Sequence, residues 1–162
     1  MDTSEAIDGL NSGDLTVRRR AAEHLANHPD VAAAVPLVRA CGDGDGQVRE
    51  GAVSALEGLG VPESADAAAL AELLSDGQPD VRYWSATLLG RLGRRAALAV
   101  EPLAKATAHD AESAVRQRAA WALGEIGPAA AAARSMLTQA AAGDDPRLAR
   151  LAKQSLEKIG VD

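Results

Sequence analysis

The sequence predicts an all-α fold in which about ten helices form five stacked repeats, an α-solenoid, and two observations support this class. The first is an internal repeat in which a Val-Arg pair opens an amphipathic helical pattern. The pairs begin at Val17, Val48, Val81 and Val115, and Leu148 opens a weaker last copy, so the steps are 31, 33, 34 and 33 residues. A repeat of this length is typical of helical solenoids. The second observation is that 47% of the residues are hydrophobic but only 2% are aromatic. A core of Ala, Leu and Val suits closely packed helices.

The first helix of each repeat carries one apolar face. When it is projected at about 100° per residue, the opening residue and the residues 4, 7, 8 and 11 positions later fall on one arc. We expect this arc to be buried. In the fourth copy it contains Val115, Ala119, Ala122, Leu123 and Ile126, and in the second copy Val48, Ala52, Ala55, Leu56 and Leu59.

Turn residues separate the predicted helices at regular positions. Three positions before each opening residue we expect a helix start, where an acid in four of the five copies can cap free backbone N–H groups or favour the positive end of the helix dipole. Thr3 or Ser4 is expected to cap a short N-terminal helix over residues 3–11, and second helices are expected at about 30–41, 63–75, 95–108 and 129–142. The N-cap positions are Asp14, Asp45, Gln78, Glu112 and Asp145, with Asp43, Asp76 and Asp110 two residues further upstream. Left-handed helix ends are predicted at Gly60, Gly93, Gly127 and Gly160.

Composition limits the functional classes. The net charge is −6, but residues 1–80 carry 15 acids and 5 bases, whereas residues 81–162 carry 8 acids and 12 bases. The basic C-terminal half is suited to steer an acidic partner, although uneven surface charge alone also explains it. No apolar run reaches the roughly 20 residues that span a bilayer, and the acidic start is unlike a signal peptide. A cytoplasmic protein without a cofactor is expected, and the single Cys41 fits a reducing compartment.

The Val-Arg pairs at 17–18, 48–49, 81–82 and 115–116, the run Ala-Leu-Gly-Glu-Ile-Gly at 122–127 and the acids before each pair resemble the HEAT-repeat superfamily. The similarity is to its short bacterial branch related to phycobilisome-lyase repeats, and it covers nearly the whole chain. It implies a right-handed superhelix whose Val-Arg helices line the concave face. It also implies a ladder in which Arg18, Arg49, Arg82 and Arg116 meet loop acids and carbonyls. The implied organisation is a single repeat domain over residues 1–162, with a cap helix at 1–13, repeats at 14–42, 43–75, 76–109 and 110–142, and a terminal helix at 143–162.

The positions 2, 3, 6 and 10 residues after each opening residue point away from the apolar arc. In the geometry that the resemblance implies, they form the concave surface. All three aromatic residues of the chain fall there, and Trp, Tyr and Arg dominate interface hot spots. We therefore expect a shallow groove that binds a protein or peptide segment. The candidate binding residues are Tyr83, Trp84, Thr87, Arg91, Gln117, Arg118, Trp121 and Glu125.

The two tryptophans decide between two interpretations of this surface. If they belong to the groove, replacing Trp84 and Trp121 together by Ala removes partner binding and leaves the melting temperature nearly unchanged. The alternative is that they fill gaps between repeats, since Trp is seldom fully exposed in a monomer.

Other functions have weaker support. His24 and His28 lie four residues apart, but no third metal ligand is identifiable, so polarity of the terminal repeat explains them better. Trp121 and Glu125 resemble the pattern of HEAT-like DNA glycosylases, yet the chain lacks a long basic track. A groove that holds a bilin chromophore or its acceptor protein is the remaining enzymatic alternative. A non-enzymatic scaffold is expected, either a monomer or a weak end-to-end dimer through its last helix, which carries Leu148, Leu151, Leu156 and Ile159.

Overall fold

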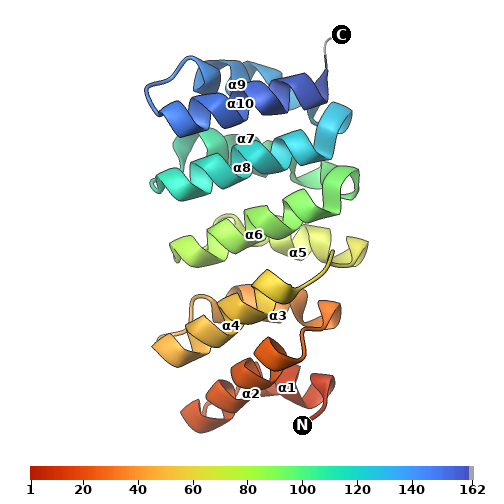
Figure 1. Cartoon of the computed structure of the whole chain (residues 1–162), viewed down its shortest axis with the longest axis vertical. Coiled ribbons are helices and arrows are strands. Elements are labelled where there is room, and N and C mark those ends of the chain that lie inside the picture. The colour runs from red at the N-terminus through yellow and green to blue at the C-terminus, as the bar shows by residue number, and fades with distance from the viewer. Residues whose placement is uncertain (161–162) are drawn as a thin grey trace. The chain divides into compact units, whose positions relative to one another are not determined.

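The computed structural model describes residues 1–160, and this part of the chain is helical, with no strand. Short 3-10 segments precede the second helix of each repeat, so there are more helical segments than the predicted ten or so. The predicted all-α solenoid class is confirmed (Figure 1). The helices are α1 (Thr3–Leu10), α2 (Leu15–Asn27), α3 (Ala34–Ala40), α4 (Gly46–Gly58), α5 (Ala67–Leu73), α6 (Pro79–Leu92), α7 (Val100–His109), α8 (Ser113–Ile126), α9 (Arg134–Ala141) and α10 (Pro146–Ile159). The 3-10 segments are η1 (Val31–Ala33), η2 (Ser64–Asp66), η3 (Gly93–Ala99) and η4 (Gly127–Ala133).

The chain forms two compact units, Met1–Asp66 and Ala67–Asp162. The boundary falls inside the predicted repeat 43–75, between η2 and α5. The single repeat domain over residues 1–162 therefore stays a prediction. None of the helices in the described part of the chain is long and apolar enough to cross a membrane.

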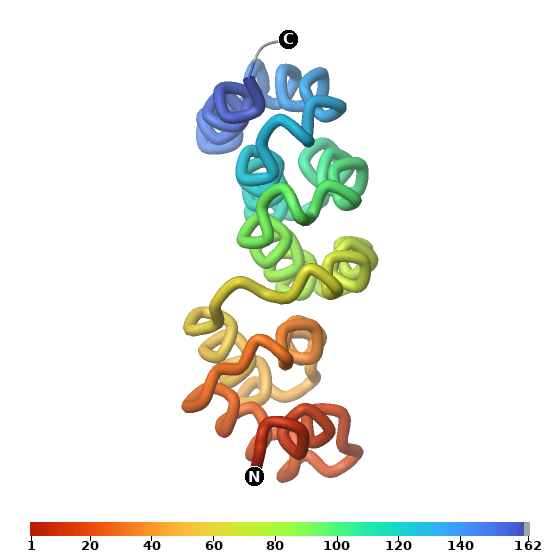
Figure 2. Tube along the Cα trace, turned by 90° about the vertical axis from the view of Figure 1, so that its right-hand side faces the viewer, coloured from red at the N-terminus to blue at the C-terminus, as the bar shows by residue number. Residues whose placement is uncertain are grey.

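In the first unit, α2 and α4 form one layer and α1 and α3 form the other (Figure 2). Gly51 allows α4 to approach α2 closely, because a Cβ atom at this position would lie 2.8 Å from the Cβ of Ala22. The Nε of Arg18 donates to Asp43 Oδ2 at 2.9 Å, and its Nη1 donates to the carbonyl of Ser12. The first step of the predicted arginine ladder is thus present in this unit.

In the second unit, α6, α8 and α10 lie side by side as one layer, with α5, α7 and α9 as the other (Figures 1 and 2). Arg82 repeats the ladder here, since its Nε and Nη2 donate to the two carboxylate oxygens of Asp110 at 2.8 and 2.9 Å. The predicted apolar arcs are buried: Val115, Ala119, Ala122, Leu123 and Ile126 here, and Val48, Ala52, Ala55, Leu56 and Leu59 in the first unit, are each at most 5% exposed.

The helix starts follow the predicted pattern in part. Asp14, Asp45 and Asp145 cap α2, α4 and α10 through their carboxylates. Gln78 and Glu112 occupy the predicted N-cap positions of α6 and α8, but their side chains make no cap hydrogen bond. There the upstream acids Asp76 and Asp110 accept hydrogen bonds from the N-cap N–H groups instead. The cap of α1 is Asp2, and not Thr3 or Ser4, because Asp2 and Glu5 form a reciprocal capping box.

The helix ends agree at three of the four predicted glycines. Gly93, Gly127 and Gly160 have φ of 59°, 73° and 84°, which only glycine adopts readily. Gly60 does not have a positive φ. Helix α4 ends at Gly58, and Leu59 is extended with φ −71° and ψ 139°, so the chain leaves this helix without a left-handed turn.

Candidate functional site

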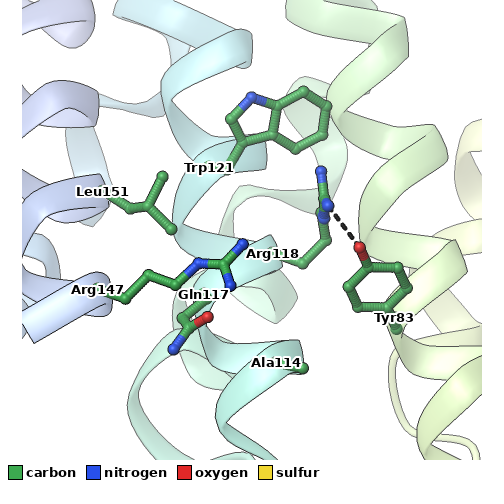
Figure 3. Close-up of a pocket in the computed structure, with 7 residues that line it drawn as sticks. All are labelled: Tyr83, Ala114, Gln117, Arg118, Trp121, Arg147 and Leu151. Atoms are coloured by element: carbon green, nitrogen blue, oxygen red, sulfur yellow. Dashed lines mark hydrogen bonds between the residues drawn. The ribbon is translucent and has the colours of Figure 1, made fainter. Parts of the chain in front are cut away.

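A pocket of about 180 Å³ lies on the layer formed by α6, α8 and α10, entirely within the second unit (Figure 3). Its residues come from all three helices and lie away from the buried apolar arcs, and we call this surface the Val-Arg face. The pocket is lined by Tyr83, Ala114, Gln117, Arg118, Trp121, Arg147 and Leu151.

Arg118 is the centre of the pocket. Its guanidinium carbon lies 4.8 Å from the ring centroid of Tyr83 and 5.0 Å from that of Trp121. Its Nη2 also donates to the hydroxyl of Tyr83, as Figure 3 shows. Such cation–π contacts contribute roughly 0.5–2 kcal/mol each. The two rings therefore hold the guanidinium in a defined position on α8, facing α6.

Trp121 is half-buried because its ring packs against α6. A Cβ atom at Gly90 would lie 2.3 Å from Cζ3 of Trp121, so only glycine leaves room for the indole at this position. Glycine inside a helix costs about 1 kcal/mol relative to Ala. Glycine is favoured at position 90 despite this cost, because the indole of Trp121 packs directly against the backbone of α6 there.

The third side of the pocket is tied to the start of α10. Gln117 Nε2 donates to Asp145 Oδ2 at 3.0 Å, while Oδ1 of Asp145 accepts from the N–H groups of Arg147 and Leu148. The hydrogen bond from the Leu148 N–H and that from Gln117 lower the pKa of the Asp145 carboxyl. The first unit has the same arrangement at the equivalent position, where Arg19 Nη2 and Asp45 Oδ2 lie 2.7 Å apart.

The pocket is electropositive. Its charged lining residues are Arg118 and Arg147, and no acidic residue lines it. Burial lowers the pKa of the Arg91 guanidinium, and the positive charge of Arg118 lowers it further. The charges of Arg91 and Arg118 therefore repel each other. Figure 3 shows the Arg147 guanidinium pointing from α10 toward Gln117 and Arg118.

The structure brings four of the eight predicted binding residues into this pocket, namely Tyr83, Gln117, Arg118 and Trp121. Arg91 lies outside it, with its guanidinium carbon 5.9 Å from the ring centroid of Trp84. Glu125 is also outside and forms an ion pair with Lys158.

The expectation that all eight residues lie on an exposed surface is wrong for Trp84 and Thr87, which are 9% and 5% exposed. The edge of the Trp84 ring meets Tyr83, and the Thr87 hydroxyl donates to the Tyr83 carbonyl. The joint replacement of Trp84 and Trp121 is therefore expected to lower the melting temperature, and not to leave it nearly unchanged, because Trp84 is buried. The helices α6, α8 and α10 contact each other side by side, and these contacts bury residues outside the apolar arc. The helical projection treated all residues outside the arc as exposed.

Three pocket residues were not predicted as binding residues, namely Ala114, Arg147 and Leu151. A sequence signal for them exists. Ala114 and Arg118 lie four residues apart on α8, and Arg147 and Leu151 lie four apart on α10, so each pair shares one helix face. In both repeats the first member directly precedes the opening residue, a position that the projection left out.

The histidine pair belongs to the first unit, with His24 in α2 and His28 at the C-cap of that helix. The rings of His24 and His28 stack with centroids 4.8 Å apart. Among residues 1–160, no group of three or more His, Cys, Asp or Glu side chains is placed to hold a metal ion.

The repeats of this chain match a known protein family over nearly their whole length. A family model described as HEAT repeats matches residues 3–69 and again residues 67–157. The chain belongs to the HEAT-repeat family. The arginine–aspartate ladder and the Val-Arg helices described above are thus features of its HEAT repeats. No curated protein matches the chain significantly.

Two engineered proteins and a designed armadillo-repeat protein are among the solved structures that share the fold of this chain. The superposition with one engineered protein has a TM-score of 0.67 and 22% sequence identity, and it covers 98% of this chain and 80% of the engineered protein. A second engineered protein has a TM-score of 0.68 and 22% identity, with 98% and 81% covered. A designed armadillo-repeat protein in complex with the peptide (KR)4 has a TM-score of 0.68 and 18% identity, with 96% and 80% covered. At these identities the similarity concerns the fold of the HEAT repeats.

Proposed function

We propose that the protein is a non-enzymatic scaffold that binds a protein or peptide segment on the Val-Arg face. The main contacts with the partner are made in the pocket around Arg118. The observation that carries this proposal is the guanidinium of Arg118 held between Tyr83 and Trp121 at the centre of a partly open pocket. Arg, Trp and Tyr contribute most of the energy in protein interfaces when they are clustered and rigid. A cluster already ordered in the free protein loses little conformational entropy on binding.

Two further observations support a peptide over a small molecule. The pocket, at about 180 Å³, is smaller than the roughly 300–1,000 Å³ of typical cofactor and ligand sites. It therefore suits one or two side chains of a peptide better than a chromophore. The designed armadillo-repeat protein of similar fold is in complex with a peptide, so a fold of this kind is compatible with peptide binding.

Selection of binders from a random peptide library tests the proposal. The immobilised protein is compared with two pocket variants, Trp121→Ala and Leu151→Gln, and with the control Leu98→Gln, in which an apolar side chain 58% exposed on η3 is made polar. We expect the selected peptides to bind the wild type and the control equally and to lose about tenfold or more in affinity with either pocket variant. Peptides that bind all four proteins alike would refute the assignment of the pocket. Circular dichroism establishes that each variant is folded.

A further inference from the structure

The two arginines of the pocket contact different groups from the three arginines of the Val-Arg helices that form ion pairs. Arg18, Arg19 and Arg82 each form an ion pair with an aspartate of the following loop. Arg118 instead contacts two aromatic rings and a phenol hydroxyl, and within residues 1–160 it has no carboxylate partner. The Arg147 side chain is exposed and has neither a hydrogen bond nor an ion pair to the described residues.

One aspartate contacts the lining of the pocket, but it bonds to Gln117 and not to either guanidinium. Asp145 accepts hydrogen bonds from Gln117 and from two N–H groups at the start of α10. Within residues 1–160, neither guanidinium of the pocket forms an ion pair with a carboxylate, and the charge of Arg91 adds to theirs. Beside the two guanidiniums lie the apolar surfaces of Trp121 and Leu151.

We propose that this pocket recognises an acidic peptide segment, in which an Asp or Glu carboxylate binds between the guanidiniums of Arg118 and Arg147 and a neighbouring apolar side chain packs on Trp121 and Leu151. This inference rests on the proposed scaffold function and specifies its partner. Arginine forms short, charge-assisted hydrogen bonds with carboxylates. The rings of Tyr83 and Trp121 already fix the orientation of the Arg118 side chain. Binding of the carboxylate therefore costs little additional side-chain conformational entropy.

The same geometry disfavours a nucleic acid as the partner. Single strands bind proteins by stacking their bases on exposed aromatic rings along a basic groove. Here Arg118 lies over both Tyr83 and Trp121, and the Trp121 ring also meets α6 at Gly90. The ring surface left for bases is small, and the pocket presents only two guanidiniums where a strand needs a continuous track of cations.

The test uses four fluorescently labelled probes: three pools of short peptides and single-stranded oligothymidylate. In every peptide pool, alternate positions hold Leu or Val. The remaining positions hold Glu or Asp in the acidic pool, Lys or Arg in the basic pool, and Gln or Asn in the neutral pool. Affinities are measured by fluorescence anisotropy for the wild type, for Arg118→Gln with Arg147→Gln, and for Arg147→Gln alone. The charge-matched control is Arg94→Gln with Lys105→Gln, which removes two exposed cations from η3 and α7. Arg147 is exposed, so its single replacement keeps the test valid if the double variant folds poorly.

We expect the acidic pool to bind the wild type and the control within twofold of each other. The double pocket variant should bind it about tenfold or more weakly, with Arg147→Gln in between. Added salt should weaken binding, because exposed charges are screened.

Equal losses in the control and the pocket variants would overturn the inference, because general charge would then explain the binding. So would binding of the basic or neutral pool that does not depend on the two arginines, although the scaffold function would stand in that case. Pocket-dependent binding of oligothymidylate in preference to every peptide pool would overturn both proposals.

Discussion

Replacement of Gly124 by Ala tests whether α8 and α10 approach as closely as the structure places them. A Cβ atom at Gly124 would lie 2.5 Å from Oγ, 2.9 Å from Cβ and 3.0 Å from the backbone Cα of Ser155. The Ser155 hydroxyl is buried and donates to the Ala120 carbonyl at 2.7 Å, so moving it breaks a buried hydrogen bond. The added methyl group must therefore separate the two helices or displace the hydroxyl from its hydrogen bond.

The expected loss combines three terms. Overpacking costs about 1–3 kcal/mol, and loss of the buried hydrogen bond costs about 1–3 kcal/mol. Against this, Ala stabilises a helix interior by about 1 kcal/mol relative to Gly. A net loss of about 3 kcal/mol in the free energy of unfolding is expected, which lowers the melting temperature by about 6–12 °C in a protein of this size.

Thermal denaturation followed by far-UV circular dichroism measures this effect. The matched control is Gly46→Ala in α4, where the nearest atom to the new Cβ is Nη2 of the flexible Arg49 side chain at 3.7 Å. The control should melt at or slightly above the wild-type temperature. A Gly124→Ala variant that melts at the wild-type temperature or higher would refute the close approach of α8 and α10.

Three further predictions follow from burial and from the ion pairs. The hydrogen bond from Arg19 lowers the pKa of Asp45 to about 2; in an NMR titration Arg19→Gln should move this midpoint up toward the ordinary aspartate value, and an unchanged midpoint would exclude the pairing in solution. Burial raises the pKa of Asp110, but its hydrogen bonds outweigh this and the net shift is downward; because the folded pKa lies below the unfolded one, Asp110 stabilises the protein above about pH 4 and this contribution is lost as the pH falls further. Asp110→Asn should therefore melt below the wild type at neutral pH, and a difference that persists unchanged into acid would contradict this account. Trp84→Ala should cost about 3–5 kcal/mol, as for other buried aromatic residues, and a melting temperature equal to that of the wild type would show that Trp84 is not part of the core.

The sequence by itself determined the repeated helices and their buried faces. The period of the Val-Arg pairs and the spacing of apolar residues depend only on local helix geometry, so Val48, Leu56, Leu123 and Ile126 could be placed in the core without coordinates. The same local rules located three of the four helix ends at glycine. They also contained the cap of α1, which our sequence-based prediction missed: Asp2 and Glu5 stand three residues apart, the spacing of a capping box, and Asp2 caps the helix in place of Thr3 or Ser4.

Only the tertiary structure decided which residues of the other helix face are available to a partner. Trp84 and Arg118 occupy equivalent positions three residues after their opening valines, yet Trp84 is buried and Arg118 lines a pocket. Helices in one layer contact each other at their sides, and the burial there depends on which side chains meet, such as Trp121 against Gly90. These are contacts between residues about 30 positions apart in the sequence, and no projection of one helix contains them.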